Sequence, residues 1–116
     1  MADVTIYHNP KCSKSRQTLA LLEEKNITPE IILYLESPPE AKQLTHIIAL
    51  LGINARGLIR TGEAEYTELG LDDKNLAETS LIDAMVNTPK LIQRPIVIAN
   101  GQARIGRPPE AILEII

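Results

Sequence analysis

The chain contains one cysteine, Cys12, and basic residues lie on both sides of it. Lys11 and Lys14 are close neighbours, His8 lies four residues before the cysteine, and Arg16 lies four residues after it. The thiolate is the nucleophilic form of cysteine, and nearby positive charge lowers the pKa of a thiol. The spacing therefore favours a reactive Cys12. The alternative is a structural cysteine, because free cysteines are often buried and inert.

Three polar side chains near Cys12 could support the thiol. His8, when protonated, would add positive charge beside a thiolate, or it would be a hydrogen-bonded structural group at a strand end. Asn9 could orient the thiol through its amide or only form the turn. Ser15 could donate a hydrogen bond to a thiolate or bond to its own backbone. Each residue thus has a structural interpretation beside the functional one.

Other chemistries of cysteine and histidine are excluded by spacing. A Cys-x-x-Cys dithiol would need a second cysteine at position 15, which is Ser15. A phosphatase-type loop has an arginine six residues after the cysteine, where this chain has Thr18. The sequence shows no metal-ligand spacing, no phosphate-binding glycine loop and no Ser-His-Asp set. We therefore expect no metal site.

Several arginines fall in segments expected to be irregular or at element edges, namely Arg56, Arg60, Arg94, Arg104 and Arg107. Two of them directly precede prolines, at Arg94-Pro95 and Arg107-Pro108. The guanidinium fork matches the geometry of oxyanions. In a chain with a thiol at the start of a helix, these arginines favour the binding of an oxyanion. The alternative is that they are only solvated charges on the surface.

The first elements of the chain would position Cys12. Residues 4–7 are β-branched and aromatic, which predicts a strand, and Asn9-Pro10 breaks it. A helix is expected from Cys12 or Ser13 to about residue 25. Residues 30–35 are nearly all apolar, which predicts a strand buried on both faces. The parallel βαβ unit places Cys12 at a helix N-terminus, where free N–H groups favour a thiolate.

The rest of the chain predicts helices and a hairpin. Residues 37–52 predict a helix that begins with a Ser37–Glu40 capping box and ends at Gly52. Short helical turns are expected over residues 54–73. Asn75 with Glu78 is expected to open another helix, which must end before Pro89.

Asn100-Gly101 predicts a hairpin between strands at 96–99 and 102–106, and Pro108-Pro109 begins a last helix. The order of elements predicts one α/β domain over residues 1–116, with a four-stranded mixed sheet flanked by helices.

Composition narrows the class of protein. The net charge of −3 argues against a general nucleic-acid surface. One cysteine cannot form an internal disulfide, which fits a reducing compartment. The first residues show no signal peptide, and no stretch approaches the roughly 18 apolar residues of a membrane span. We therefore expect a cytoplasmic protein that binds neither nucleic acid nor a membrane.

The chain resembles the glutaredoxin-linked arsenate reductase (ArsC) family in the segments YHNPKCSKSR, IILYLESPP, RGLIR, LIQRPIVIANG and IGRPPE. The match runs in order from Val4 to Ile116. The His-x3-Cys-x3-Arg start is specific when it is combined with Arg-Pro-Ile-Val. The resemblance implies a thioredoxin-like fold with a helical insertion, which agrees with the expected order of elements.

The resemblance also assigns site residues. Cys12 matches the nucleophile of the family, and His8 matches a residue thought to tune the thiol. The oxyanion-binding arginines correspond to Arg60, Arg94 and Arg107. The Arg94-Pro95 bond matches a cis peptide beside the active site. The residues expected to support the active site are Asn9, Ser15, Arg16 and Pro95.

This resemblance implies reduction of arsenate, or a similar oxyanion, to arsenite through a covalent Cys12–arsenate intermediate. Glutathione is the implied co-substrate and glutaredoxin the implied partner, with no bound cofactor.

Two departures from the family pattern keep an alternative open. The chain ends at Ile116, whereas the characterised arsenate reductases continue further, so it looks like the shorter paralogues of the family. The resemblance also extends to redox-responsive regulators of the Spx type, which bind RNA polymerase and usually carry Cys-x-x-Cys. Ser15 breaks that pattern. An enzyme is therefore the leading hypothesis, and a regulator or adaptor without arsenate turnover is the alternative.

Overall fold

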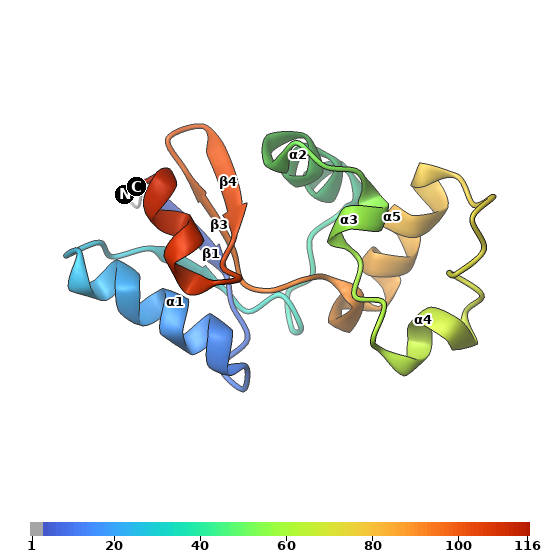
Figure 1. Ribbon diagram of the computed structural model, residues 1–116, viewed down its shortest axis with the longest axis horizontal. Helices are drawn as coiled ribbons and strands as arrows, with labels where there is room; N and C mark the ends of the chain where they lie inside the picture. Colours follow the sequence, from blue (N-terminus) through green and yellow to red (C-terminus); the bar gives the residue numbers. More distant parts are fainter. Residues whose placement is uncertain (1–3) are drawn as a thin grey trace. The chain divides into compact units, whose positions relative to one another are not determined.

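The computed structural model describes residues 4–116 (Figure 1). They form two compact units. The first contains the described residues up to Ser37 together with Arg94–Ile116, and the second is Pro38–Gln93. Within residues 4–116, no helix is long and apolar enough to cross a membrane.

A four-stranded mixed sheet forms the centre of the first unit. Its strands are β1 (Val4–Tyr7), β2 (Glu30–Ile32), β3 (Ile96–Ala99) and β4 (Gln102–Ile105). The strand order is β2-β1-β3-β4, in which β1 runs parallel to β2 and antiparallel to β3. Strand β4 pairs antiparallel with β3. The predicted mixed sheet and its parallel βαβ unit are confirmed.

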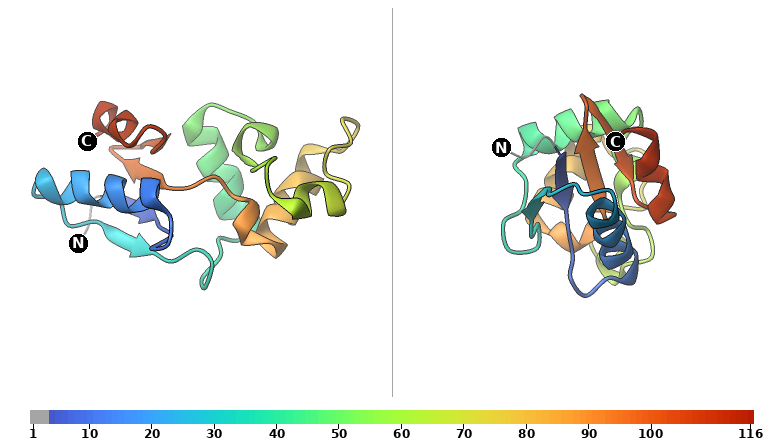
Figure 2. Two further views of the ribbon diagram at one scale, coloured as in Figure 1. Left: turned by 60° about the horizontal axis from the view of Figure 1, so that its bottom comes forward. Right: turned by 90° about the vertical axis from the view of Figure 1, so that its left-hand side faces the viewer.

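Two helical segments cover one face of this sheet. They are α1 (Ser13–Glu24) and the 3-10 helix η2 (Pro109–Glu114), which lie side by side in Figures 1 and 2. The core between them and the sheet contains Val4, Ile6, Leu22, Val97, Ala99, Ile112 and Ile115. The last predicted helix is thus present, but as six residues of 3-10 helix. This cluster consists of aliphatic side chains.

Strand β2 differs from its prediction. The strand ends at Ile32 instead of continuing to residue 35, and it lies at the edge of the sheet. Ile31 is 47% exposed and Leu35 is 46% exposed. The expectation of a strand buried on both faces is therefore wrong. Apolar content does not reveal the strand order, and only the strand order decides which strand lies at an edge.

The second unit is helical. Its elements are α2 (Ala41–Leu51), α3 (Ala55–Leu58), α4 (Ala64–Glu68), α5 (Glu78–Asn87) and the 3-10 helix η1 (Pro89–Leu91). Helix α5 packs against α2 and α3. The buried residues of α2 and α5 are apolar, namely Leu44, Ile47, Ile48, Leu81, Ile82 and Met85. The short helical turns over 54–73 and the helix end before Pro89 are confirmed.

The start of α2 lies three residues later than the predicted capping box. Glu40 is the N-cap residue, and its backbone N–H donates to Gln43 Oε1 at 2.9 Å. Ser37 instead belongs to the turn after β2, where its N–H donates to the carbonyl of Leu33 at 2.8 Å. Both Ser37–Glu40 and Glu40–Gln43 have capping-box spacing, so the spacing alone did not identify the correct pair. Gly52 ends the helix in a left-handed conformation, as predicted.

The C-terminal hairpin has the predicted turn. Asn100 and Gly101 have φ values of 53° and 73°, which suit the two central residues of a type I′ turn. After the hairpin, Gly106 is buried where α1 and the Pro95 segment approach it closely. A Cβ at Gly106 would lie 2.5 Å from Thr18 Oγ1 and 2.8 Å from Pro95 Cγ. The approach of α1 to the end of β4 therefore requires a glycine.

We predict that Gly106→Ala destabilises the protein by about 1–3 kcal/mol, because a methyl group overfills a packed site. Urea unfolding of the parent and variant measures this difference. Gly62→Ala is the matched control, since a Cβ at Gly62 would meet no atom within 4 Å and the φ of Gly62 is not positive. Equal stability of Gly106→Ala and the parent would show that the contact to Thr18 relaxes without cost.

Candidate active site

Cys12 occupies the N-cap position of α1, directly after the loop that follows β1. Its backbone N–H donates to the carbonyl of Asn9 at 3.0 Å, and its carbonyl accepts from the N–H of Arg16 at 3.0 Å. The side chain is partly exposed. The predicted location at the exit of a strand and the N-terminus of a helix is confirmed. An N-cap side chain faces the free N–H groups of the first helical turn.

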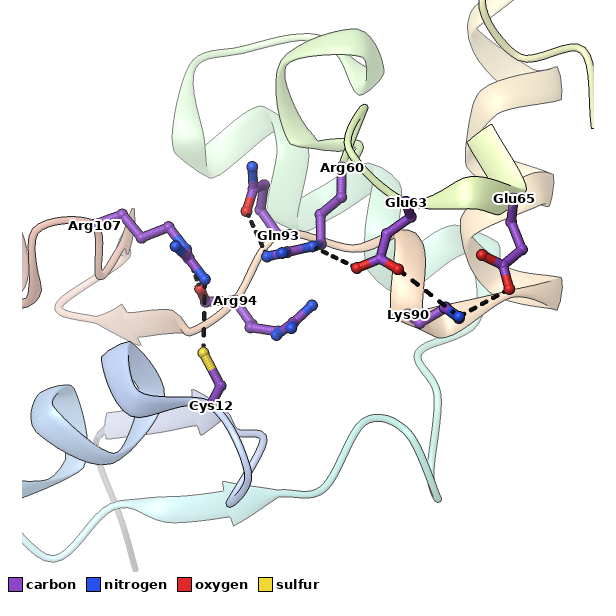
Figure 3. Close-up of polar contacts among 8 residues, drawn as sticks. All are labelled: Cys12, Arg60, Glu63, Glu65, Lys90, Gln93, Arg94 and Arg107. Atoms are coloured by element: carbon purple, nitrogen blue, oxygen red, sulfur yellow. Dashed lines mark hydrogen bonds and ion pairs between the residues drawn. The ribbon is translucent and has the colours of Figure 1, made fainter. Parts of the chain in front are cut away.

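The surroundings of Cys12 lower the pKa of its thiol. Burial alone would raise this pKa, but the backbone N–H of Ser15, the guanidinium of Arg94 and the backbone N–H of Lys14 outweigh it. A second arginine also contacts the sulfur, since Arg107 Nη2 donates to Cys12 Sγ at 3.6 Å (Figure 3). The arrangement favours the nucleophilic thiolate.

A buried hydrogen-bond network fixes the loop before Cys12. His8 Nδ1 and Ser15 Oγ are 2.6 Å apart, and the Asn9 N–H donates to the same hydroxyl at 3.0 Å. Asn9 Oδ1 in turn accepts from the Lys11 N–H at 3.0 Å. The side chains of His8, Asn9 and Ser15 are therefore structural supports of the loop.

The structure favours the structural interpretation of His8. Burial lowers the pKa of His8, and the positive charge of Arg16 lowers it further. A lowered pKa favours the uncharged ring. The ring contacts Ser15, whose backbone N–H faces the sulfur of Cys12. Arg16 also braces the loop, because its Nη1 donates to the carbonyl of Pro10 at 2.9 Å.

Arg94 and Arg107 come from two segments that bind each other. Arg107 Nε donates to the carbonyl of Arg94 at 2.7 Å, and the Gly106 N–H donates to the carbonyl of Pro95 at 2.9 Å. The Arg94-Pro95 bond is cis, as the resemblance implied, and Arg107-Pro108 is cis as well. Among residues 4–116, the buried Nε of Arg94 has no hydrogen-bond partner. One donor of Arg94 is thus left without a partner among the described residues.

The remaining arginines divide into two groups. Arg60 lies in the second unit, where its Nη1 donates to Gln93 Oε1 at 3.2 Å and its Nε lies 3.4 Å from Glu63 Oε1 (Figure 3). Its part in an oxyanion site stays a prediction. Glu63, the partner of Arg60, also pairs with Lys90, whose Nζ lies 3.7 Å from Glu63 Oε2 and 2.8 Å from Glu65 Oε2.

Arg56 and Arg104 make structural contacts. Arg56 donates to Tyr66 Oη and to the carbonyls of Leu71 and Asp73 at 2.7–2.9 Å. Arg104 pairs with Glu114 at 3.0 Å. The positions of the five arginines at irregular segments did not separate these two from the others, because the contacts of Arg56 and Arg104 come from other parts of the chain. The family resemblance had assigned only Arg60, Arg94 and Arg107 to the oxyanion.

Sequence reasoning missed the position of Gly106. Its signal was present, since a glycine directly before Arg107-Pro108 marks a close approach of backbone to other atoms. Among the described residues, no group of His, Cys, Asp and Glu side chains could hold a metal ion.

The sequence pattern of the ArsC family matches residues 7–115. The chain belongs to the ArsC family. It is 58% identical over 114 residues to the uncharacterized protein YfgD of Escherichia coli, covering 97% of this chain and 96% of YfgD. It is 48% identical over 113 residues to an arsenate reductase of Neisseria meningitidis, covering 97% of both chains. The solved structure of an arsenate reductase from Vibrio cholerae matches all of both chains, with a TM-score of 0.96 and 53% identity.

These likenesses confirm the family and the thioredoxin-like fold that the sequence predicted. The matched residues of the ArsC family include Cys12, Arg94 and Arg107, so the thiol and both arginines that contact it lie inside the region of similarity.

We predict that Cys12 alkylates with a midpoint pH below that of the same cysteine in the urea-unfolded chain. The folded site stabilises the thiolate, so reactivity persists at pH values where an unfolded thiol is protonated. Iodoacetamide alkylation rates measured against pH give both midpoints.

Arg94→Ala should move the folded midpoint upward, because it removes a cation that favours the thiolate. Lys14→Ala is the control, since Lys14 acts on the sulfur through its backbone N–H. An identical midpoint for Arg94→Ala and Lys14→Ala would remove Arg94 from the thiolate environment.

Proposed function

We propose that the chain reduces arsenate to arsenite in the cytoplasm, with glutathione and glutaredoxin as the electron donors. The observation that carries this proposal is a partly exposed thiol of lowered pKa at a helix N-terminus, with the guanidinium groups of Arg94 and Arg107 beside it. Such a site pairs a nucleophile with groups that bind an oxyanion. Relatives of similar length that are named arsenate reductases support arsenate as the substrate.

The first chemical step would be attack of the Cys12 thiolate on arsenic. An S–As bond forms, an As–O bond breaks, and the oxygen leaves as water after protonation, so arsenic remains pentavalent. Arg94 and Arg107 would hold the arsenate oxygens and stabilise the charge that builds on them. For Arg60, oxyanion binding rests on the family resemblance alone.

The second stage transfers two electrons to arsenic. Two thiols supply them, one from glutathione and one from glutaredoxin, and these leave joined as a mixed disulfide. Arsenite is released and the Cys12 thiol is restored. The chain has no second cysteine that could form an internal disulfide, which is why the reaction needs external thiols. We propose no bound cofactor and no metal ion for this reaction.

We predict that Cys12→Ser abolishes arsenate turnover but retains anion binding. A serine hydroxyl is hardly ionised at neutral pH without an activating base, so the nucleophile is lost while the arginines remain. An NADPH-coupled assay with arsenate, glutathione, glutaredoxin and glutathione reductase measures turnover. Calorimetric titration with arsenate or phosphate measures binding. Arsenate reduction by Cys12→Ser would show that the thiol is not the nucleophile.

Arg94→Ala should give the complementary result. The thiol still alkylates, but anion affinity falls about 10- to 150-fold, because a charge-assisted contact contributes roughly 1.5–3 kcal/mol. Arg94→Lys should restore only part of this affinity, since the fork geometry is lost. Arg104→Ala is the matched control, because Arg104 pairs with Glu114. Unchanged anion affinity in Arg94→Ala would make Arg94 a surface charge.

The same purified protein tests the regulator alternative. A pull-down with RNA polymerase should give no stable, salt-resistant complex. Such a complex, together with no arsenate turnover in the coupled assay, would overturn the proposed enzyme activity.

A further inference from the structure

A concave pocket of about 300 Å³ lies beside the loop that carries the nucleophile. Residues 8–11 form one side, and Leu33, Leu35 and Glu36 form the other. These two loops follow β1 and β2, which are the parallel pair of the sheet. The His8 N–H donates to the Ile32 carbonyl at 2.9 Å and joins the loops at their start. The pocket is therefore at the carboxyl ends of neighbouring parallel strands, where α/β proteins commonly bind ligands.

The pocket wall combines exposed apolar side chains with two opposite charges. Leu33 and Leu35 are 36% and 46% exposed, although leucine side chains are usually buried. Lys11 and Glu36 are both exposed at the same pocket. Within residues 4–116, neither of these two side chains forms an ion pair. Apolar walls with a few placed charges are typical of small-molecule sites, and 300 Å³ is at the small end of their range.

The loop that forms one wall is held in place without a ligand. Asn9 Oδ1 accepts from the Lys11 N–H at 3.0 Å, and Arg16 donates to the Pro10 carbonyl at 2.9 Å. A site fixed in this way loses little conformational entropy when a ligand binds. Lys11 is also the residue directly before Cys12. A molecule in the pocket would therefore lie next to the backbone of the reacting cysteine.

We propose that this pocket binds the peptide thiol that reduces the Cys12 adduct, a molecule of the glutathione class. Such a thiol carries carboxylates and an ammonium group joined by short aliphatic segments. A carboxylate would pair with Lys11, the ammonium with Glu36, and the aliphatic segments would cover Leu33 and Leu35. This inference rests on the proposed function, since it locates the co-substrate of that reaction. It adds a binding site made of residues outside the proposed oxyanion site.

The first test is steady-state kinetics on Leu35→Asn and Glu36→Gln, with glutathione and arsenate varied separately. We expect KM for glutathione to rise about fivefold in Leu35→Asn, from lost apolar contact. A rise of about tenfold is expected in Glu36→Gln, from the lost charge-assisted contact. KM for arsenate and the rate of Cys12 alkylation should match the parent. Leu113→Asn and Glu110→Gln are matched controls, because both are exposed residues of η2 and neither lines the pocket.

The second test measures binding without turnover. S-methylglutathione cannot reduce an adduct, so its binding is independent of arsenate chemistry. In two-dimensional ¹H–¹⁵N spectra of the full chain, it should shift the amides of Lys11, Leu35 and Glu36 in the parent, and Leu35→Asn should weaken this binding about fivefold. Shifts at these amides support the pocket even if the parent fails to reduce arsenate, in which case only the proposed function is wrong.

Three results would overturn the pocket assignment. One is arsenate turnover by the parent together with parental KM values for glutathione in both pocket variants. Another is the absence of shifts at the pocket amides at saturating S-methylglutathione. The third is a raised KM for glutaredoxin with an unchanged KM for glutathione, which would make Leu33 and Leu35 a docking surface for a protein.

Discussion

The site depends on one electrostatic condition, the stabilisation of a thiolate at the N-terminus of α1. Burial of Cys12 opposes this charge, and the backbone N–H groups of Ser15 and Lys14 together with Arg94 overcome the opposition. Two of these groups belong to the helix itself. The charge of the nucleophile is therefore tied to the formation of α1, and anything that displaces the first turn of the helix also displaces the donors that make the sulfur reactive.

The first turn of α1 is held by buried polar contacts. Ser15 is fully buried, and its hydroxyl contacts both the His8 ring and the Asn9 N–H. Buried polar groups are costly when unpaired, so such a network constrains the loop to one arrangement. The lowered pKa of His8 fits its structural role in this network, because a neutral ring is more easily buried than a charged one. Gly106 adds a steric constraint from the opposite side, where Thr18 of α1 leaves no space for a Cβ.

Oxyanion binding and thiol reduction would use different surfaces of the loop that carries Cys12. Arg94 and Arg107 approach the sulfur from the segments before β3 and after β4, and they are joined by the hydrogen bond from Arg107 Nε to the Arg94 carbonyl. The pocket with Leu35 and Glu36 is formed instead by the loops after β1 and β2. The proposed oxyanion groups and the proposed thiol pocket therefore use different residues of the first unit.

Local patterns in the sequence determined the place of Cys12 at the start of a helix, the Asn100-Gly101 hairpin and the end of α2 at Gly52, because each depends on residues a few positions apart. The mixed sheet followed from the order of the predicted elements along the chain. The family motif added the assignment of Arg94 and Arg107. Only the tertiary structure showed what Arg56 and Arg104 bind instead, since their partners are Tyr66, Leu71, Asp73 and Glu114. It also decided that β2 is an edge strand with an exposed Ile31 and that burial lowers the pKa of His8. Strand order and burial are set by which distant segments pack together, and no local pattern of residue types specifies that.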